Sequence, residues 1–350
     1  MAKKIGTGII GYGLSGKVFH APFIFKHPGF ELKSVVERKT GASLEKYPSI
    51  RLVMDYRELL ADNELELIVV GTPNILHFQM VEEILESGKH VVVEKPFTPT
   101  SVQADELIKI SEKFDRKIFV FHNRRWDGDF LTIKKILDQE LLGDVLEFEA
   151  HFDRFTPELD STQWRDRPGP GSGILFDLGP HLIDQAIQLF GYPGALSADI
   201  KSQREKSLVD DYFEIDLYYD HMKATLKAGM FVKEPGPRYT IHGTRGSFIK
   251  YGIDPQEDML KTGKMPEGAN WGKEDPAFWG YLNTTTAEGP FAGTVETEPG
   301  NYHGFYDNVY DVLVNGAGQM VKPEEARNVI RIIELAFESA ELGEIVNFNA

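Results

Sequence analysis

Residues 11–16 read Gly-Tyr-Gly-Leu-Ser-Gly, a glycine spacing suited to holding a pyrophosphate. Gly11 permits a tight turn, Gly13 lets the backbone come close to the phosphates, and Gly16 lets the following helix pack closely on the preceding strand. The N–H groups and the dipole at the start of that helix favour the negative charge of the ligand. The spacing therefore predicts a dinucleotide site.

The segments around this turn agree with that prediction. An apolar run at residues 5–10 predicts a strand before the turn, and a second strand-like run at 30–36 ends on Glu37. An acid at this place accepts hydrogen bonds from a ribose, whereas Arg38 and Lys39 beside it favour an additional phosphate. The choice between NAD and NADP stays open. The predicted cofactor contacts here are Gly11, Gly13, Leu14, Ser15, Gly16, Glu37 and Arg38.

Residues 94–96, Glu-Lys-Pro, follow a strand-like run at 90–93. Ligands of open parallel sheets bind beyond the carboxyl ends of the strands, and lysine is seldom buried without a partner. Lys95 is therefore expected to hydrogen-bond a substrate hydroxyl and to assist its proton transfer, with Glu94 beside the cofactor. A solvated lysine after a strand is the alternative. The sequence does not show whether the peptide bond before Pro96 is cis.

A neighbouring strand-like run at 67–70 is followed by Thr72, Pro73 and Asn74, with His77 one turn later. Pro73 restricts the loop, and Asn74 and His77 are expected to face the ribose or the nicotinamide. An ordinary turn followed by a helix cap explains the same residues equally well.

Asp177 and His181 are four residues apart and would share one face of a helix. Oxidation of an alcohol needs a group that takes the hydroxyl proton as hydride leaves, and histidine suits this role near neutral pH. A neighbouring carboxylate would fix the tautomer of the ring and stabilise its charged form. A helix whose start is capped by Asp177 is the simpler interpretation. Together with Lys95 and the glycine turn, the pair is predicted to be catalytic.

Two further segments combine rings with guanidinium groups. After another strand end, Asn123 is expected to contact the cofactor, and His122 and Arg125 the substrate. Trp164 and Arg165 precede a glycine-rich stretch, and an aromatic face beside a guanidinium suits a sugar or polyol. Arginines on a solvated acidic surface explain these residues equally well.

The elements that must position these residues change in character along the chain. Up to residue 121, short β-rich runs alternate with amphipathic helical patterns, which predicts a doubly wound parallel sheet. Beyond it, alternating strand-like segments predict an α+β half with a mostly antiparallel sheet. We expect a cofactor-binding domain over 1–121 and an α+β substrate domain over 122–350. The latter would contain a long irregular segment at 252–300 and a closing helix at 323–342.

The composition limits the class of protein. The chain of 350 residues has 41% hydrophobic and 26% charged residues, as globular proteins do. It contains no cysteine, which excludes disulfides and fits a reducing, cytoplasmic compartment. A formal net charge of −16 argues against nucleic acid or an anionic membrane as a partner. We expect no metal site, no membrane span and no signal peptide.

The glycine turn, the Glu94-Lys95-Pro96 motif and the pair Asp177 and His181 together resemble the glucose–fructose oxidoreductase, inositol dehydrogenase and rhizopine catabolism family (Gfo/Idh/MocA). The resemblance covers essentially the whole chain. The segments 121–127, 130–135 and 248–258 are similar to members that act on scyllo-inositol with NADP.

This resemblance implies an α/β fold, with an N-terminal Rossmann domain and a C-terminal α+β domain whose large open sheet forms homodimers or homotetramers. It also implies hydride transfer between NAD or NADP and a ring hydroxyl or ketone of a small polyol or sugar, first of all an inositol. By motif match, Lys95, Asp177 and His181 take the catalytic positions. Relatives that use NADP usually have a small polar residue in place of Glu37.

Two alternatives remain at this stage. One is an aldose or glycoside dehydrogenase of the same family. The other is a regulatory protein that binds NAD(P) without catalysis, which has no need for the three catalytic side chains.

Overall fold

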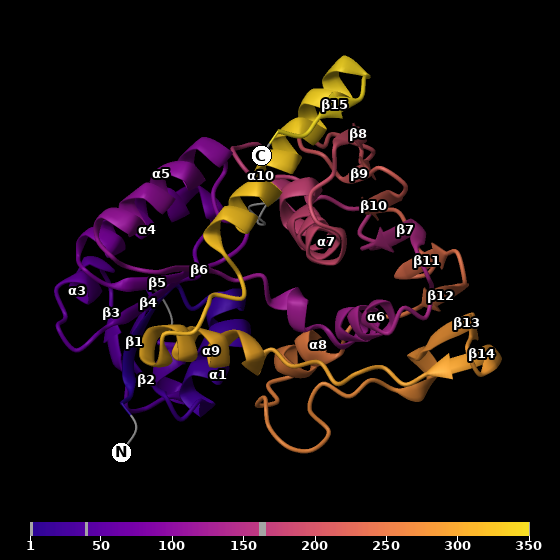
Figure 1. Ribbon diagram of the computed structural model, residues 1–350. Coiled ribbons are helices and arrows are strands. Elements are labelled where there is room, and N and C mark those ends of the chain that lie inside the picture. The colour runs from indigo at the N-terminus through magenta and orange to yellow at the C-terminus, as the bar shows by residue number, and fades with distance from the viewer. Residues whose placement is uncertain (1–2, 39–40, 161–165, 350) are drawn as a thin grey trace. The chain divides into compact units, whose positions relative to one another are not determined.

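The structure is a computed structural model that describes residues 3–38, 41–160 and 166–349. Contacts between residues divide the chain into two units, which Figure 1 shows in the colours of the sequence. The first unit comprises residues 1–123, 256–271 and 301–327, and the second comprises 124–255, 272–300 and 328–350.

The first unit is built on a six-stranded parallel sheet in the order β3-β2-β1-β4-β5-β6. Its strands are β1 (Ile5–Ile10), β2 (Phe30–Val36), β3 (Arg51–Val53), β4 (Leu67–Val70), β5 (His90–Val93) and β6 (Ile118–Val120). This order confirms the doubly wound fold, and it reverses between β1 and β4, where such sheets bind their ligands. Both strands are buried along their whole length, which explains their continuous apolar sequences.

Helices cover both faces of this sheet. Figure 1 shows α4 and α5 on one face, and α1 and α9 on the other. The helical segments are η1 (Gly16–His20), α1 (Ala21–Lys26), α2 (Ala42–Lys46), α3 (Arg57–Leu60), η2 (Asn74–Leu76), α4 (His77–Glu86), α5 (Ser101–Lys113), α8 (Gln256–Lys261), α9 (His303–Tyr310) and η6 (Asp311–Asn315).

Two segments from late in the sequence return to the first unit, a grouping that differs from the expected division at residue 121. Aromatic packing and hydrogen bonds hold these late segments to the first unit. The ring of Tyr306 stacks on Phe23 at an interplanar angle of 12°. The side-chain amide of Gln319 donates to the carbonyl of Ile118 over 2.8 Å. Because such bonds join residues some 200 or more positions apart, no local pattern of the sequence predicts them.

The second unit is built on a nine-stranded sheet in the order β14-β13-β12-β11-β7-β10-β9-β8-β15. Neighbouring strands are antiparallel except β7 and β10, which are parallel, so the expectation of a mostly antiparallel sheet is confirmed. The strands are β7 (Val145–His151), β8 (Ala195–Lys201), β9 (Tyr212–Tyr218), β10 (Lys223–Gly229), β11 (Tyr239–Gly243), β12 (Gly246–Lys250), β13 (Gly280–Thr286), β14 (Gly289–Val295) and β15 (Val346–Asn347).

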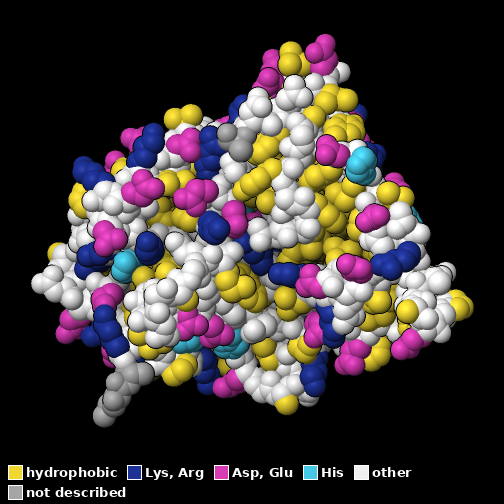
Figure 2. All heavy atoms as spheres, viewed as in Figure 1, with side chains coloured by type: hydrophobic (Ala, Val, Ile, Leu, Met, Phe, Trp, Pro, Cys, Tyr) yellow, Lys and Arg dark blue, Asp and Glu magenta, His cyan; other side chains and the backbone are white. Residues whose placement is uncertain are grey.

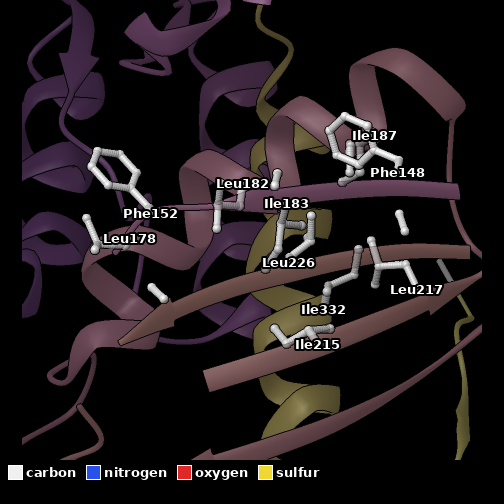
Figure 3. Close-up of a cluster of buried hydrophobic side chains, with 14 of the residues drawn as sticks. Phe148, Phe152, Leu178, Leu182, Ile183, Ile187, Ile215, Leu217, Leu226 and Ile332 are labelled. Atoms are coloured by element: carbon white, nitrogen blue, oxygen red, sulfur yellow. The ribbon is translucent and has the colours of Figure 1, made fainter. Parts of the chain in front are cut away.

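One face of this sheet packs against α7 (Ile174–Phe190), which carries the core of the second unit. Along β9, buried Phe213, Ile215 and Leu217 alternate with half-buried residues, as in a strand with one covered face. Figure 3 shows Leu182 and Ile183 of α7 pointing toward this apolar layer. The other helical segments are η3 (Asn123–Trp126), α6 (Gly128–Asp138), η5 (Pro276–Phe278) and α10 (Pro323–Leu342).

The segment 252–300 is more regular than the sequence predicted. It contains α8, η5 and the strands β13 and β14, which pair along seven residues each. The edge strand β14 and its neighbour β13 are rich in Gly and Thr, and they lack the dense apolar runs that reveal a central strand. The prediction of a long irregular segment over 252–300 was therefore wrong in part, since only residues 262–275 form a long stretch without a helix or strand.

Figure 2 shows acidic and basic side chains interspersed over the visible face, so the acidic excess does not gather into one patch there. None of the helices in the described part of the chain combines the length and the apolar character that crossing a membrane requires.

Candidate functional site

The glycine-rich turn follows β1 as the sequence predicted, and each glycine has its own physical reason. Gly11 has a φ of +93°, and a Cβ there would lie 2.8 Å from the carbonyl oxygen of Gly71. A Cβ on Gly16 would lie 2.1 Å from the carbonyl oxygen of Gly11. At Gly13, by contrast, no described protein atom lies within 4 Å of such a Cβ. The open space at Gly13 fits the close approach of a dinucleotide phosphate.

Glu94 lies beneath this turn instead of facing outward. The hydroxyl of Ser15 donates to its Oε1, and the Nε2 of His20 lies 3.0 Å from the same oxygen. Its Oε2 accepts the backbone N–H of Lys95 over 3.1 Å. Burial alone would raise the pKa of Glu94, but these donors hold it below its usual range. The side chain expected beside the cofactor is thus a buried, ionised support of the turn.

Lys95 follows β5 at the carboxyl edge of the sheet, as predicted, and its side chain is half-buried. The peptide bond between Lys95 and Pro96 is cis. This placement agrees with the rule that ligands bind beyond the carboxyl ends of parallel strands.

Glu37, at the end of β2, holds the start of α2. Its Oε1 accepts the N–H of Ala42 over 3.0 Å, and its Oε2 accepts both the N–H and the hydroxyl of Ser43 over 3.0 and 2.7 Å. The carboxylate therefore already has protein donors on both oxygens, which leaves it less free to accept a ribose. Arg38 beside it is exposed, and Lys39 lies outside the described residues.

His77 braces two loops at the edge of the sheet. Its Nε2 lies 2.9 Å from the carbonyl oxygen of Thr72, and its Nδ1 lies 3.0 Å from that of Pro96. Burial is the largest influence on its pKa and lowers it. Because the ring is fully buried, the direct cofactor contact expected from the sequence is not open to it. Asn74 is also buried, and Pro73 precedes the short helix η2.

Asp177 and His181 lie on α7, as predicted, and both side chains are buried. The helix begins after Gly173, whose φ of +91° suits glycine. It is not Asp177 that caps the helix but Asp210, whose Oδ2 accepts the N–H of Leu175 over 2.7 Å. Burial raises the pKa of Asp210 to about 6. A remote carboxylate thus holds the helix that carries the predicted catalytic pair.

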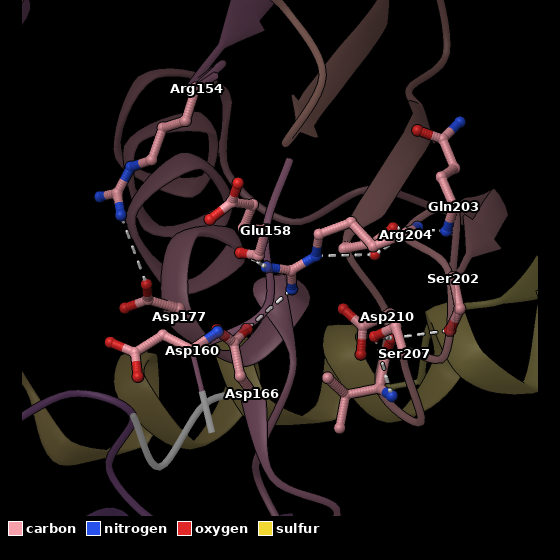
Figure 4. Close-up of polar contacts among 12 residues, drawn as sticks. Arg154, Glu158, Asp160, Asp166, Asp177, Ser202, Gln203, Arg204, Ser207 and Asp210 are labelled. Atoms are coloured by element: carbon pink, nitrogen blue, oxygen red, sulfur yellow. Dashed lines mark hydrogen bonds and ion pairs between the residues drawn. The ribbon is translucent and has the colours of Figure 1, made fainter. Parts of the chain in front are cut away.

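Arg154 is a candidate that the sequence prediction missed. Its Nη1 lies 3.8 Å from the Oδ2 of Asp177, and Figure 4 shows the two side chains facing each other. Its guanidinium carbon lies 5.5 Å from the ring centre of Phe152, whose ring in turn lies 6.3 Å from that of His181. The side chain is 32% exposed, so it remains accessible to a ligand. Only its position just past a strand end could have signalled it.

The loop beside α7 is fixed by a buried guanidinium. The guanidinium of Arg204 donates hydrogen bonds to the carboxylates of Asp166 and Asp211 over 2.7 and 3.0 Å, and all three side chains are buried. Figure 4 shows Arg204 and Asp210 in the same region. Since Asp210 adjoins Asp211, this ion cluster also positions the residue that caps α7.

The other residues that the sequence predicted to contact the substrate lie in different environments. Arg125 donates two hydrogen bonds, of 2.8 and 2.6 Å, to the carboxylate of Asp184, and both side chains are buried. This pair fastens η3 to α7. His122 and Asn123 are buried as well. Trp164 and Arg165 lie outside the described residues.

Two family profiles match nearly the whole chain. Residues 5–122 match the family described as "Oxidoreductase family, NAD-binding Rossmann fold". Residues 134–348 match its companion, "Oxidoreductase family, C-terminal alpha/beta domain". Both belong to the Gfo/Idh/MocA group, in agreement with the glycine turn and with the two sheets.

Individual relatives agree. The chain is 40% identical over 337 residues to the scyllo-inositol 2-dehydrogenase (NADP(+)) IolW of Bacillus subtilis, covering 96% of this chain and 94% of that protein. It is 42% identical over 342 residues to the oxidoreductase YdgJ of Escherichia coli, covering 97% and 98%. The solved structure of the Bacillus subtilis oxidoreductase yvaA superimposes with a TM-score of 0.96 at 38% identity, covering 100% of this chain and 99% of that one.

The expected family is thereby confirmed, together with the expectation of NAD or NADP as the cofactor. The protein belongs to the Gfo/Idh/MocA family of NAD(P)-dependent oxidoreductases, enzymes that act on CH–OH groups.

Proposed function

We propose that this oxidoreductase interconverts a ring hydroxyl and a ring ketone of a polyol or sugar, with scyllo-inositol as the first candidate, and that Lys95, Asp177 and His181 are its catalytic groups. The observation that carries the substrate is the 40% identity, over 96% of the chain, to a protein named as a scyllo-inositol 2-dehydrogenase. The same protein's name gives NADP(+) as its cofactor, and we propose that this chain accepts both NAD and NADP.

The dinucleotide, when bound, supplies the acceptor of the hydride. A ring nitrogen of His181 takes the hydroxyl proton, so that the hydroxyl carbon becomes a carbonyl. Asp177 lies one helical turn before His181, and its negative charge favours the protonated ring. The Lys95 ammonium donates a hydrogen bond to the substrate oxygen, on which negative charge develops.

Arg154 extends this set. Its guanidinium lies 3.8 Å from Asp177 and is partly exposed, so it can both hold Asp177 ionised and donate to a second substrate hydroxyl. A polyol offers several hydroxyls at fixed spacing, and a forked donor recognises such a pair.

A substrate panel tests the proposal. Reduction of NAD and of NADP is followed with scyllo-inositol, myo-inositol, glucose and a methyl glycoside. We expect the highest kcat/KM with scyllo-inositol. A higher value with glucose or the glycoside would assign the protein to the aldose or glycoside dehydrogenases. Tight NADPH binding with no turnover of any member of a broad polyol and sugar panel would identify a regulatory binder.

Variants test the catalytic groups. Lys95→Met and His181→Asn should each lower kcat by about 100- to 10,000-fold, because each removes a group that acts in proton transfer. The NADPH dissociation constant should change much less. Lys113→Met and His221→Asn, at exposed positions, are the matched controls. Near-normal turnover in either catalytic variant would refute the role given to that residue.

A further inference from the structure

Four polar side chains form a continuous line inside the first unit. The hydroxyl of Tyr306, on α9, lies 2.7 Å from the Nδ1 of His20, at the end of η1. The Nε2 of His20 lies 3.0 Å from the Oε1 of Glu94, and the same oxygen accepts the hydroxyl of Ser15 in the glycine turn. Tyr306 and His20 are fully buried, although they are 286 residues apart in sequence.

Each donor and acceptor of this line has a partner. Burial, and then the charge of Glu94, raise the pKa of Tyr306 far above its usual value, so its phenol stays neutral and its hydroxyl bonds the Nδ1 of His20. An ionised carboxylate only accepts hydrogen bonds, so the Nε2 of His20 donates to Glu94. The carboxylate, whose pKa is lowered, receives this bond while ionised. We assign the proton on Nε2 from the ionised carboxylate that it faces.

Burying these four polar side chains costs more free energy than filling the same space with apolar side chains would. The surroundings are aromatic: the ring of His20 lies 4.4 Å from that of Phe121, and Tyr306 packs edge-on against Phe305 at 5.4 Å. Apolar side chains would fill such a space without the cost of burying a carboxylate, which is tolerated only when it is fully bonded. The polar groups therefore indicate a positional task.

The task follows from what Glu94 reaches. Its Oε1 holds Ser15, in the middle of the glycine turn, and its Oε2 holds the backbone N–H of Lys95. One carboxylate thus fixes both the turn that receives the pyrophosphate and the main chain of the proposed catalytic lysine.

We propose that Glu94, His20 and Tyr306 are positioning residues for the dinucleotide, and that Tyr306 makes α9 a working part of the cofactor site. The phenol orients the imidazole, the imidazole orients the carboxylate, and the carboxylate sets the geometry of Ser15 and Lys95. The inference rests on the dinucleotide-binding part of the function and is independent of which polyol is the substrate.

Tyr306→Phe is the central variant, because it removes one oxygen and keeps the ring in the aromatic cluster. The dissociation constant of NADPH is measured by quenching of protein fluorescence, without substrate. We expect it to rise about 3- to 10-fold, the effect of losing one buried hydrogen bond. Tyr310→Phe is the matched control on the same helix, since its hydroxyl donates to the carbonyl of Lys3, over 3.2 Å, and to no other group in the described part of the chain. It should bind NADPH as the wild type does.

A double-mutant cycle separates positioning from packing. If Tyr306 acts through Glu94, then Tyr306→Phe should weaken NADPH binding in the wild type but change it less than 2-fold in a Glu94→Ala background. A packing role predicts that the two effects multiply. Thermal unfolding shows whether each variant is folded, and Glu94→Gln replaces Glu94→Ala if the latter is not.

Each outcome decides the matter. Multiplying effects, or an unchanged NADPH constant in Tyr306→Phe, would overturn the inference. Failure of the inositol panel alongside a non-additive cycle would remove the proposed substrate and leave the positioning role intact. Turnover of inositol alongside an additive cycle would support the proposed substrate and remove the positioning role.

Discussion

The helix that follows the glycine turn and the helix that carries Asp177 and His181 begin in similar ways. Each starts near a glycine, and each is held by a carboxylate from a distant part of the chain, Glu94 in the first unit and Asp210 in the second. The carboxylates differ in their donors. Glu94 is bonded by Ser15, His20 and the N–H of Lys95, whereas the donors to Asp210 are backbone N–H groups.

This difference sets the charge of each support. The side-chain donors keep the pKa of Glu94 below its usual range, so it stays ionised beneath the turn. Burial, together with the negative charge of Asp211, raises the pKa of Asp210 to about 6, so it titrates close to neutral pH. The comparison teaches that two carboxylates with the same structural task can respond oppositely to acid. The following predictions probe it.

The largest effect is expected at Gly173. A Cβ there would lie 1.9 Å from the Oδ1 of Asp210, at a φ of +91° that disfavours any other residue. Gly173→Ala should therefore lower the free energy of unfolding by about 2–4 kcal/mol, measured by urea denaturation. Gly13→Ala is the contrasting variant, since nothing described lies within 4 Å of its Cβ. It should leave stability nearly unchanged and weaken NADPH binding. Equal losses of stability in both variants would contradict this account.

Removal of the second carboxylate should cost less. Asp210→Ala deletes the acceptor of the N–H of Leu175 and should destabilise the protein by about 1–3 kcal/mol. Asp210→Asn keeps an acceptor and should cost less than about 1 kcal/mol. Denaturation curves of the two variants show how much of the free energy of unfolding comes from the hydrogen bond to Leu175 and how much from the charge of Asp210. If they are equally destabilised, it is the charge of Asp210 that stabilises α7.

The pH dependence follows from the raised pKa of Asp210. Its pKa is about 6 in the folded protein and 3.8 in an unfolded chain, so between these values the folded state binds more protons. The contribution of Asp210 to stability is therefore full below about 4 and is lost as the pH rises through about 6. Unfolding free energies at pH 4.5 and 7 should show this slope as a difference between the wild type and Asp210→Asn. A constant difference across that interval would refute it.

The smallest effect concerns Glu37, a third carboxylate that holds a helix start. Glu37→Ser removes a negative charge near the expected place of a ribose 2′-phosphate and leaves Arg38. The ratio of kcat/KM for NADP to that for NAD should rise by about fivefold, the effect of about 1 kcal/mol. Arg38→Ala should shift it the other way. Unchanged ratios in both variants would show that this loop does not select between the cofactors.

The sequence predicted those elements whose signals are local. Strands β4 and β5 are short continuous apolar runs, as buried parallel strands must be. Helix α10 occupies residues 323–342 as predicted, because Pro323 favours a helix start and the apolar residues recur at helical spacing. The glycine turn and the place of Asp177 and His181 on one helix were predictable for the same reason.

What could not be predicted depends on distant partners. Glu94 was expected to face the cofactor, but Ser15, 79 residues away, and His20 draw it beneath the turn. His77 was expected at the ligand, yet three backbone carbonyls enclose its ring. Arg154 could not be predicted as a site residue, because its neighbour Asp177 comes from another element. A polar residue in a sequence shows what it can bond, and only the fold decides which partner it meets.

The late return of residues 301–327 to the first unit has a consequence for the protein's synthesis. A ribosome releases β1 to β6 early, but it reaches Tyr306 only after most of the second unit. At about 5–20 residues per second this delay lasts about 10–40 seconds. During this delay, α9, the helix that packs on Phe23 and His20 in the finished protein, has not yet been synthesised. The nascent sheet must remain protected during that interval, and a fragment ending at residue 123 would keep that surface bare permanently.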